Sequence, residues 1–212
     1  RLRELMFGVA LAAVSMAAFA DADSEFSALL DEHWEWRLSS SPVLASMLGD
    51  RRFNREWQDD SPGAIEERHK ATRDFLRRAY AIDRSALSVE DQLNHELFRR
   101  QLQDDVDAHQ FGEFLMPLSS RGGIQTPENL TNQLPLVTIQ DYEDWLARIE
   151  KLPIVIDQQI KLAEEGRKRG IVAPKILMQR VPDQLATQLV DYANESPLFR
   201  VFDNLPETFG AA

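Results

Sequence analysis

The sequence predicts a mainly α-helical fold of antiparallel helical hairpins or a small bundle. Apolar residues recur three and four positions apart along most of the 212 residues, which is the spacing of one face of an α-helix. Ser or Thr precedes several of these stretches, and Gly or Pro follows them, as at helix ends. The composition, 43% hydrophobic and 28% charged residues, is that of a globular protein, and without cysteine its core must hold by packing alone.

The first half of the chain is predicted to contain four helices. Pro42 suits the first turn of the second helix, and Gly49 suits the position just after its end. Ser61 and Ser88 are expected to cap the third and fourth helices. A polar loop over 50–60 separates the second helix from the third. The predicted helices span residues 24–38, 42–48, 62–82 and about 89–108.

The fourth helix contains part of a zinc-peptidase motif. His95-Glu96 starts the pattern His-Glu-x-x-His, in which two histidines one helical turn apart bind the metal. The second histidine position holds Arg99, whose positive charge would repel a metal ion. His95 also falls opposite the predicted apolar stripe of the helix, so we predict a solvent-exposed histidine. The residues of this stripe are Val89, Leu93, Leu97, Leu102 and Val106.

No other group of residues forms a catalytic pattern. His33 lies on the apolar face of its helix beside Trp34, and we predict a partly buried, hydrogen-bonded side chain. His69 and His109 lie at helix edges, with no acidic or histidine partner at ligand spacing in the sequence. A run of carboxylates in the fourth helix is predicted to form solvated surface. This run is Asp104, Asp105 and Asp107.

The helical pattern breaks between residues 111 and 125. The stretch 111–117 is apolar and ends at a proline, so the sequence leaves a short strand or hairpin open for this region. The sequence Ser-Ser-Arg-Gly-Gly at 119–123 lacks the spacing of a phosphate-binding loop, and a turn that needs glycine is the simpler interpretation. Thr126 and Pro127 then begin a short helix.

The second half of the chain has clear helix-end signals. Thr138, with Asp141 three residues later, predicts a capping box at the start of a long helix. Pro153 is expected to kink that helix or to restart it, and Gly170 suits the left-handed position at its end. Later prolines open two shorter helices. The residues expected to face the core from the long helix are Tyr142, Trp145, Leu146, Ile149 and Leu152.

Charge and the N-terminal residues indicate the compartment and the partners. The net charge of −11 argues against nucleic acid and against an anionic membrane surface. Residues 1–20 contain two arginines, then an apolar run that ends in Ala-Phe-Ala, which is the pattern of a secretory signal peptide cleaved between Ala20 and Asp21. The run is shorter than the roughly 20 residues of a membrane helix. We therefore predict an exported protein, periplasmic or extracellular, in which residues 21–212 remain without a stable membrane anchor.

Four short stretches form a pattern whose order and spacing extend over most of the chain. The first contains Pro42, Ala45 and Gly49, and the later ones contain Gly-Gly, Trp-Leu-Ala-Arg-Ile and Glu-Gly sequences. The stretches are Ser41–Gly49, Leu115–Gln125, Asp141–Pro153 and Glu165–Pro174. Together they resemble a bacterial family known as domain of unknown function 885, which commonly has Thr where this sequence has Ser46.

The resemblance implies an activity that the residues alone do not indicate. Members of this family are longer and are similar to exported zinc metallopeptidases, with a His-Glu-x-x-His motif that would lie well beyond residue 212. The resemblance therefore implies an N-terminal helical part of a larger domain, truncated at residue 212, with zinc in the full-length protein and a peptide as substrate. No metal-binding or catalytic residue carries over to this chain. In this hypothesis an extended edge holds the peptide by strand addition, and the residues that line the cleft are Gly122, Gly123, Ile124 and Gln125.

A second hypothesis belongs to a different class of function. The chain would then be a non-catalytic helical binding or scaffold protein of the periplasm, complete as written. The coding sequence after residue 212 separates the two hypotheses. A reading frame that continues to a His-Glu-x-x-His helix favours the peptidase, and a stop codon favours the binding protein.

Overall fold

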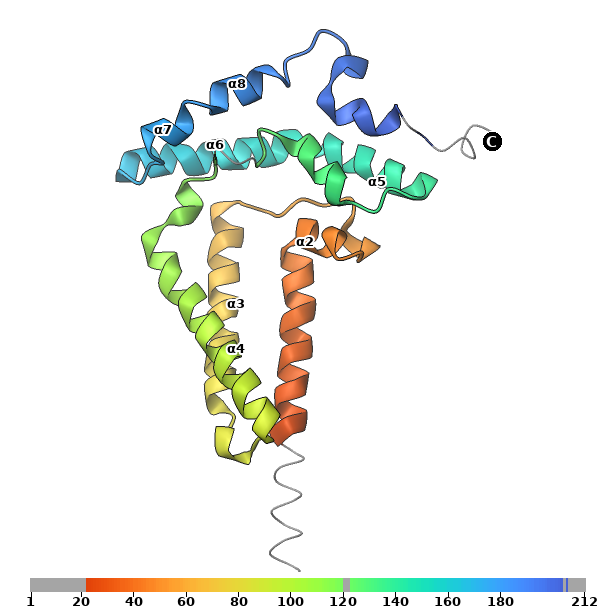
Figure 1. The fold of residues 1–212 in the computed structure, drawn as a ribbon. Helices are drawn as coiled ribbons and strands as arrows, with labels where there is room; N and C mark the ends of the chain where they lie inside the picture. The colour runs from red at the N-terminus through yellow and green to blue at the C-terminus, as the bar shows by residue number, and fades with distance from the viewer. Residues whose placement is uncertain (1–21, 120–122, 204, 206–212) are drawn as a thin grey trace, which may run out of the picture. The chain divides into compact units, whose positions relative to one another are not determined.

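The computed structural model describes residues 22–119, 123–203 and 205, and this part of the chain is mainly α-helical, as predicted (Figure 1). No strand occurs among these residues. None of the helices within them combines the length and the apolar character needed to cross a membrane. The predicted signal peptide, with its cleavage position at Ala20 and Asp21, lies outside the described residues.

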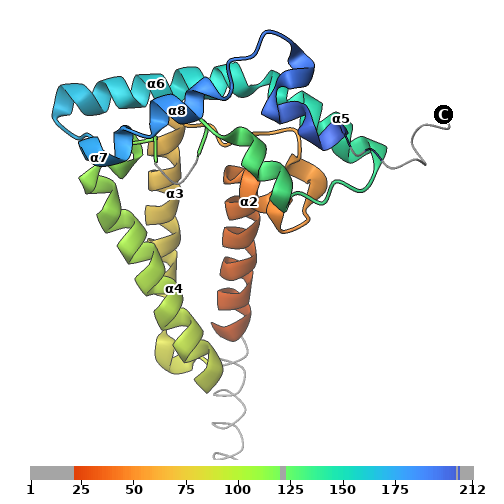
Figure 2. The ribbon, with the colours of Figure 1, turned by 45° about the horizontal axis from the view of Figure 1, so that its top comes forward.

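Figures 1 and 2 show the helices in chain order. Residues 22–40 are helical, which includes the predicted first helix. The later α-helices are α2 (Pro42–Met47), α3 (Pro62–Ala81), α4 (Val89–Ala108), α5 (Ile139–Glu150), α6 (Leu152–Arg169), α7 (Lys175–Met178) and α8 (Val181–Ala186). The 3₁₀ helices are η1 (Arg51–Phe53), η2 (Arg84–Ala86), η3 (His109–Phe111), η4 (Glu113–Leu115), η5 (Pro127–Gln133), η6 (Ala193–Glu195) and η7 (Pro197–Phe202).

The helix ends follow the local signals in the sequence. The capping box at α5 is confirmed, because Thr138 and Asp141 each accept a hydrogen bond from the other's backbone N–H. Burial would raise the pKa of Asp141, but N–H groups of Thr138 and Val137 and the charge of Arg51 hold it below its ordinary value. Pro153 restarts the chain as α6 rather than kinking one long helix.

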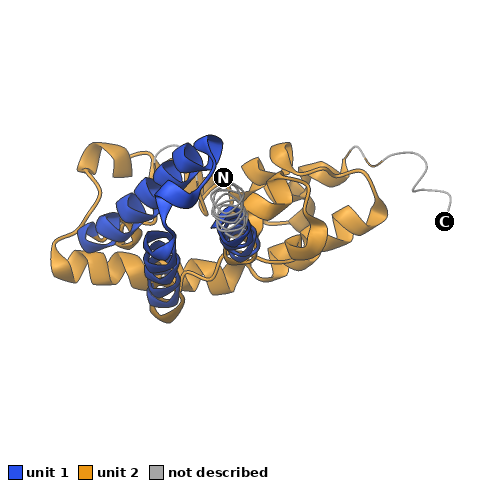
Figure 3. Ribbon diagram, turned by 90° about the horizontal axis from the view of Figure 1, so that it is seen from below, with its two compact units in different colours: residues 1–37, 66–111 blue, residues 38–65, 112–212 orange. Residues whose placement is uncertain are grey.

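The chain divides into two compact units, which Figure 3 shows in different colours. Unit 1 comprises residues 1–37 and 66–111, and unit 2 comprises residues 38–65 and 112–212. Each unit therefore combines segments that are far apart in the sequence.

Unit 1 has a core of aromatic and aliphatic side chains from the first helix, α3 and α4. The ring of His33 lies among three aromatic rings, with centroids 5.1 Å from Phe75 and 4.9 Å from Phe98. Burial lowers the pKa of His33, and the prediction that this side chain is partly buried is confirmed. The buried members of the core are Phe26, Leu29, Phe75, Leu76, Ala79, Ile82, Leu87 and Leu102.

The predicted apolar stripe of α4 is wrong for its first half. Val89, Leu93 and Leu97 are 87%, 61% and 57% exposed. His95 is fully buried instead, with Nε2 2.7 Å from the carbonyl oxygen of Ala79 and its ring against an aromatic residue of the first helix. The prediction of a solvent-exposed His95 is therefore wrong, because a backbone hydrogen bond and an aromatic contact allow a histidine to lie in the core.

No strand forms among the described residues of the 111–125 region. Phe111 ends η3, and Gly112 takes a left-handed backbone conformation, with φ of 65°, that starts η4. The other described residues there are in turns or irregular. The apolar run in this region packs against α6 instead of pairing with another strand, because Leu115 is buried in a small cluster with Leu162 of that helix.

In unit 2, the segment 50–60 is tied to α5 and α6 by a series of polar contacts. Its contacts advance along these helices as the segment itself advances, so it runs beside them in the same direction. From the sequence, this segment is predicted to be a polar loop with Phe53 and Trp57 as aromatic anchors. The contacts are Arg51–Asp141 at 3.1 Å, Arg55–Asp144 at 2.7 Å, Lys151–Glu56, and Gln158–Asp59 at 2.9 Å.

Arg148 of α5 is the largest charged side chain that unit 2 buries among the described residues. Its Nη2 donates to Ser46 Oγ at 2.7 Å and to the carbonyl oxygen of Phe53 at 2.9 Å. The guanidinium also lies over the ring of Trp57, 5.6 Å from its centroid. Burial lowers the pKa of Arg148 to about 10, against the opposing effect of Asp144, so the group stays charged at neutral pH. Arg148 thus joins α2, the 50–60 segment and α5.

Candidate functional site

Gly166 allows two other segments to lie directly against α6 in unit 2. A Cβ atom at this position would be 2.6 Å from the carbonyl oxygens of both Leu115 and Ile171. A larger residue would therefore force the backbone to move. The N–H of Ile171 donates to the carbonyl oxygen of Gly166 at 2.8 Å, after Gly170 has ended the helix with φ of 72°.

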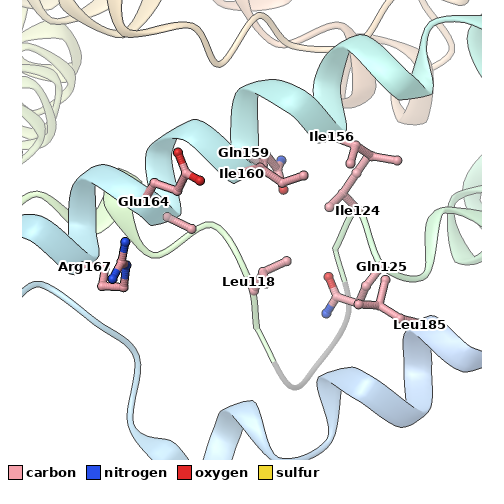
Figure 4. Close-up of a pocket in the computed structure, with 10 residues that line it drawn as sticks. Leu118, Ile124, Gln125, Ile156, Gln159, Ile160, Glu164, Arg167 and Leu185 are labelled. Atoms are coloured by element: carbon pink, nitrogen blue, oxygen red, sulfur yellow. The ribbon is translucent and has the colours of Figure 1, made fainter.

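A pocket of about 380 Å³ lies beside α6 in the same unit (Figure 4). Its volume is within the range of small-ligand sites, roughly 300–1,000 Å³. Most of the wall is aliphatic, and several of its side chains are also exposed on the helix surface. The aliphatic lining residues are Leu118, Ile124, Ile156, Ile160, Ala163 and Leu185.

A second pocket, of about 270 Å³, adjoins the first. The two share Leu118, Ala163 and Arg167 as lining residues. The smaller pocket is lined also by residues 115–117 and 171–173. These two segments can lie against α6 because Gly166 has no side chain. The close approach at Gly166 therefore shapes this part of the apolar surface.

Two glutamines bring hydrogen-bond acceptors to the wall of the larger pocket. Gln125 Nε2 donates to the carbonyl oxygen of Ser119 and, at 3.2 Å, to Gln184 Oε1. Gln159 Nε2 donates to Asp60 Oδ2 at 3.3 Å. The Oε1 atoms of both glutamines are buried and accept no hydrogen bond from the described residues. In Figure 4 the two Oε1 atoms point into the space between α6 and the residues that face it, Leu118 and Leu185.

Two charged side chains, Glu164 and Arg167, complete the lining. Both are exposed, and in the described part of the chain neither makes an ion pair. Because their charges are opposite and they lie three residues apart on α6, they give the pocket no net charge. The pocket therefore favours neither a strongly anionic nor a strongly cationic ligand.

The predicted cleft residues lie in different places. Ile124 and Gln125 line the larger pocket, and Gln125 is 1% exposed. Gly123 is exposed, does not line the pocket, and has φ of 142°, which favours glycine. Gly122 lies outside the described residues. The described residues here form no strand, and strand addition of a peptide stays a prediction.

Histidines do not form a metal site in the described residues. The structure brings together His69 and His109, which are forty positions apart, as stacked rings with centroids 3.8 Å apart. His109 Nε2 lies 3.6 Å from a carboxylate oxygen of Glu66. Burial, followed by the charge of His109, lowers the pKa of His69. Within the described ranges, no three His, Asp or Glu side chains are placed to hold a metal ion.

Sequence reasoning missed most of this pocket. Ile156, Ile160 and Ala163 recur at helical spacing along α6, and Ile156 and Ile160 are 40% and 51% exposed. The helical spacing of these residues was the available signal. It did not indicate that Leu118, Ile124 and Leu185 line the same pocket, because those contacts join distant parts of the sequence.

The fold and the site together define a helical protein with an aliphatic, amide-lined pocket of small-ligand size. A family model described as "Bacterial protein of unknown function (DUF885)" matches residues 42–211, which is most of the chain. The chain therefore belongs to the DUF885 family. No match to a curated protein is found.

Proposed function

We propose that this chain is the N-terminal helical region of an exported zinc-dependent peptidase or related hydrolase. The observation that carries the proposal is the pocket beside α6. Ile124 and Gln125, which the peptidase hypothesis assigns to a substrate cleft because the helical pattern breaks there, line this pocket together with aliphatic residues of α6. Apolar walls with a few fixed amide groups suit the side chains and the backbone of a peptide.

The other supports for the proposal are of different kinds. The family model shows that the chain belongs to the DUF885 family, but the description of that family names no activity. The peptidase activity comes from the sequence resemblance alone. Export comes from the signal-peptide pattern of residues 1–20, and N-terminal sequencing of protein from the periplasm should then begin at Asp21.

The described residues do not fit a zinc ion, since no suitable group of three ligands occurs among them. The stacked pair His69 and His109 has one carboxylate nearby, at 3.6 Å, and is no exception. No step that uses zinc is therefore assigned to this chain. In the proposal, the metal motif lies beyond residue 212, and the present residues bind and orient the substrate.

Peptide hydrolysis by the protein expressed from its complete gene tests the proposal. We expect turnover of apolar peptides that stops when a chelator removes the metal and returns when zinc is added. A variant in which alanine replaces the second histidine of the expected His-Glu-x-x-His motif should be inactive but folded. Circular dichroism of that variant provides the control for folding.

The competing hypothesis makes the opposite forecast. A non-catalytic binding protein would bind ligand in the same pocket without turnover, with or without zinc. A stop codon directly after Ala212, or a full-length protein without metal-dependent hydrolysis, would decide for that hypothesis. The pocket makes this hypothesis the second candidate, because binding a ligand there requires no catalytic group.

A further inference from the structure

We infer that the larger pocket beside α6 binds a short peptide segment with a bulky aliphatic side chain, whose backbone N–H groups donate to Gln125 and Gln159. The inference rests on the proposed function, since it names the kind of residue that a peptide substrate would place there. Three features of the pocket carry it: the aliphatic wall, the two acceptors without donors, and the balanced charge at one end.

The aliphatic wall selects the side chain of the ligand. Ile156 and Ile160 are each at least 40% exposed, although they lie in a concave wall with Ile124 and Leu185. Covering these side chains with an aliphatic group removes apolar surface from water, which is the main favourable contribution to binding in such sites. The pocket is large enough for a leucine or isoleucine side chain together with adjacent backbone.

The two glutamines select the hydrogen-bonding character of the ligand. Both Nε2 groups are engaged, by Ser119 and Gln184 for Gln125 and by Asp60 for Gln159. These bonds fix which end of each amide faces the pocket, and they leave the two Oε1 atoms without donors among the described residues. Buried acceptors are usually paired, so a ligand that supplies N–H groups fits this wall better than a hydrocarbon chain does.

The charged residues argue against a fatty acid. Arg167 alone would suit a carboxylate head group, with its acyl chain along the isoleucines of α6. Glu164 stands beside it on the same helix face, however, and offsets that charge. A hydrocarbon tail would also cover the acceptors of Gln125 and Gln159 without bonding to them. The peptide is therefore the ligand class that satisfies all of the lining.

The experiment compares two ligands on the full-length protein by isothermal titration calorimetry. The first is N-acetyl-leucyl-leucinamide, and the second is the same molecule with both leucine backbone nitrogens methylated. We expect the methylated ligand to bind on the order of tenfold more weakly, because it lacks the N–H donors. Decanoate serves as the third probe. If decanoate binds more tightly than the unmethylated peptide, the pocket is a fatty-acid site and the inference is overturned.

Variants locate the effect in the pocket. Ile160→Asp should weaken binding of the peptide by on the order of tenfold or more, since it places a charge in the aliphatic wall. Ile154→Asp is the matched control, because Ile154 is 61% exposed on the same helix but does not line the pocket. Gln159→Leu should reduce the preference for the unmethylated ligand. Equal binding by the two Asp variants, or an unchanged preference in Gln159→Leu, would overturn the inference.

Hydrolysis measured in parallel keeps this inference separate from the proposed function. Pocket-dependent binding without hydrolysis retains the inference and removes the peptidase. Hydrolysis whose KM is the same in wild type and Ile160→Asp retains the peptidase and removes the inference. Circular dichroism of the variants confirms that each is folded, which is expected because Ile160 and Ile154 are surface positions.

Discussion

The two compact units bury different kinds of residue. Unit 1 packs aromatic and aliphatic side chains, and its buried polar residues are Thr72 and His95 among those described. Unit 2 buries a larger set of polar and charged side chains. Both units leave aliphatic side chains exposed, such as Leu93 in unit 1 and Ile156 and Ile160 in unit 2. The buried polar residues of unit 2, again among those described, are Ser46, Gln125, Asp141, Asp144 and Arg148.

The difference indicates which unit is built for binding. Charged groups are costly to bury and persist where they fix a geometry that apolar packing does not specify. In unit 2 the buried charged groups fasten the 50–60 segment to α5. Hydrogen bonds from Gln158 and Gln159 to Asp59 and Asp60 fasten the same segment to α6, the helix that carries the pocket. Aliphatic side chains on the remaining face of α6 are then free to contact a ligand. Unit 1, whose core is apolar, shows no comparable arrangement in its described residues.

The largest expected effect tests the polar attachment in unit 2. Arg148→Ala should lower the free energy of unfolding by about 3–5 kcal/mol, because it leaves Ser46 and the carbonyl of Phe53 without their donor and opens a cavity. Urea unfolding followed by tryptophan fluorescence measures this.

The control for that prediction is Arg55→Ala. Arg55 forms an ion pair with Asp144, but its side chain is 54% exposed, so its loss should cost much less stability than the loss of Arg148. Arg148→Met, which retains much of the side-chain volume, should fall between the two. Equal losses for Arg148→Ala and Arg55→Ala would mean that the buried arginine does not fasten unit 2.

The next effect tests the apolar core of unit 1. Leu102→Ala should lower the free energy of unfolding by about 2–4 kcal/mol, since Leu102 is 1% exposed in the core. Leu97→Ala, on the same helix, should change it by no more than about 0.5 kcal/mol, because Leu97 is 57% exposed. Both belong to the stripe that the sequence predicts. Similar losses for the two variants would restore that stripe and contradict the core described here.

The case of α4 shows what periodicity leaves undecided. Apolar residues at helical spacing establish that a helix has faces, but not which face meets the core. Val89, Leu93 and Leu97 make one regular row, and His95 with Leu102 makes another. The first row is more apolar, yet the second is buried, because His95 finds a backbone acceptor in α3. Tertiary contacts decide between the rows.

Helix ends were easier to predict than buried polar residues, because their causes are local. The caps at Ser88 and Thr138 depend on atoms within four residues. Arg148 is buried by contacts with residues about a hundred positions earlier. The sequence pattern predicts Trp145 to be a core residue, which is confirmed. It offers no reason to expect that the charged Arg148 is buried beside it. The break in the helical pattern is what suggests a cleft at Ile124 and Gln125, whereas the residues of α6 and α8 that line the pocket with them can be identified only from the fold.

The smallest effect concerns pH and unit 1. His33 has its pKa lowered mainly by burial and also by the charge of Arg37, with Asp105 of α4 acting in the opposite direction. The unfolded chain therefore binds more protons than the folded one between the lowered pKa and the ordinary value of about 6.5, and stability falls as pH decreases through this window. Replacement by phenylalanine should remove this contribution, because a neutral ring can keep the contacts with Phe75 and Phe98.

Urea unfolding of wild type and His33→Phe between pH 8 and pH 5 measures the difference. We expect the two proteins to diverge below about pH 6.5, by no more than about 1 kcal/mol, with the wild type losing more stability. His69, whose pKa is also lowered, should leave a residual pH dependence in the variant. The same pH dependence in both proteins would mean that His33 is as well solvated in the folded chain as in the unfolded one. The aromatic surroundings of His33 would then have to be open to water, and the contrast between an apolar unit 1 and a polar unit 2 would weaken.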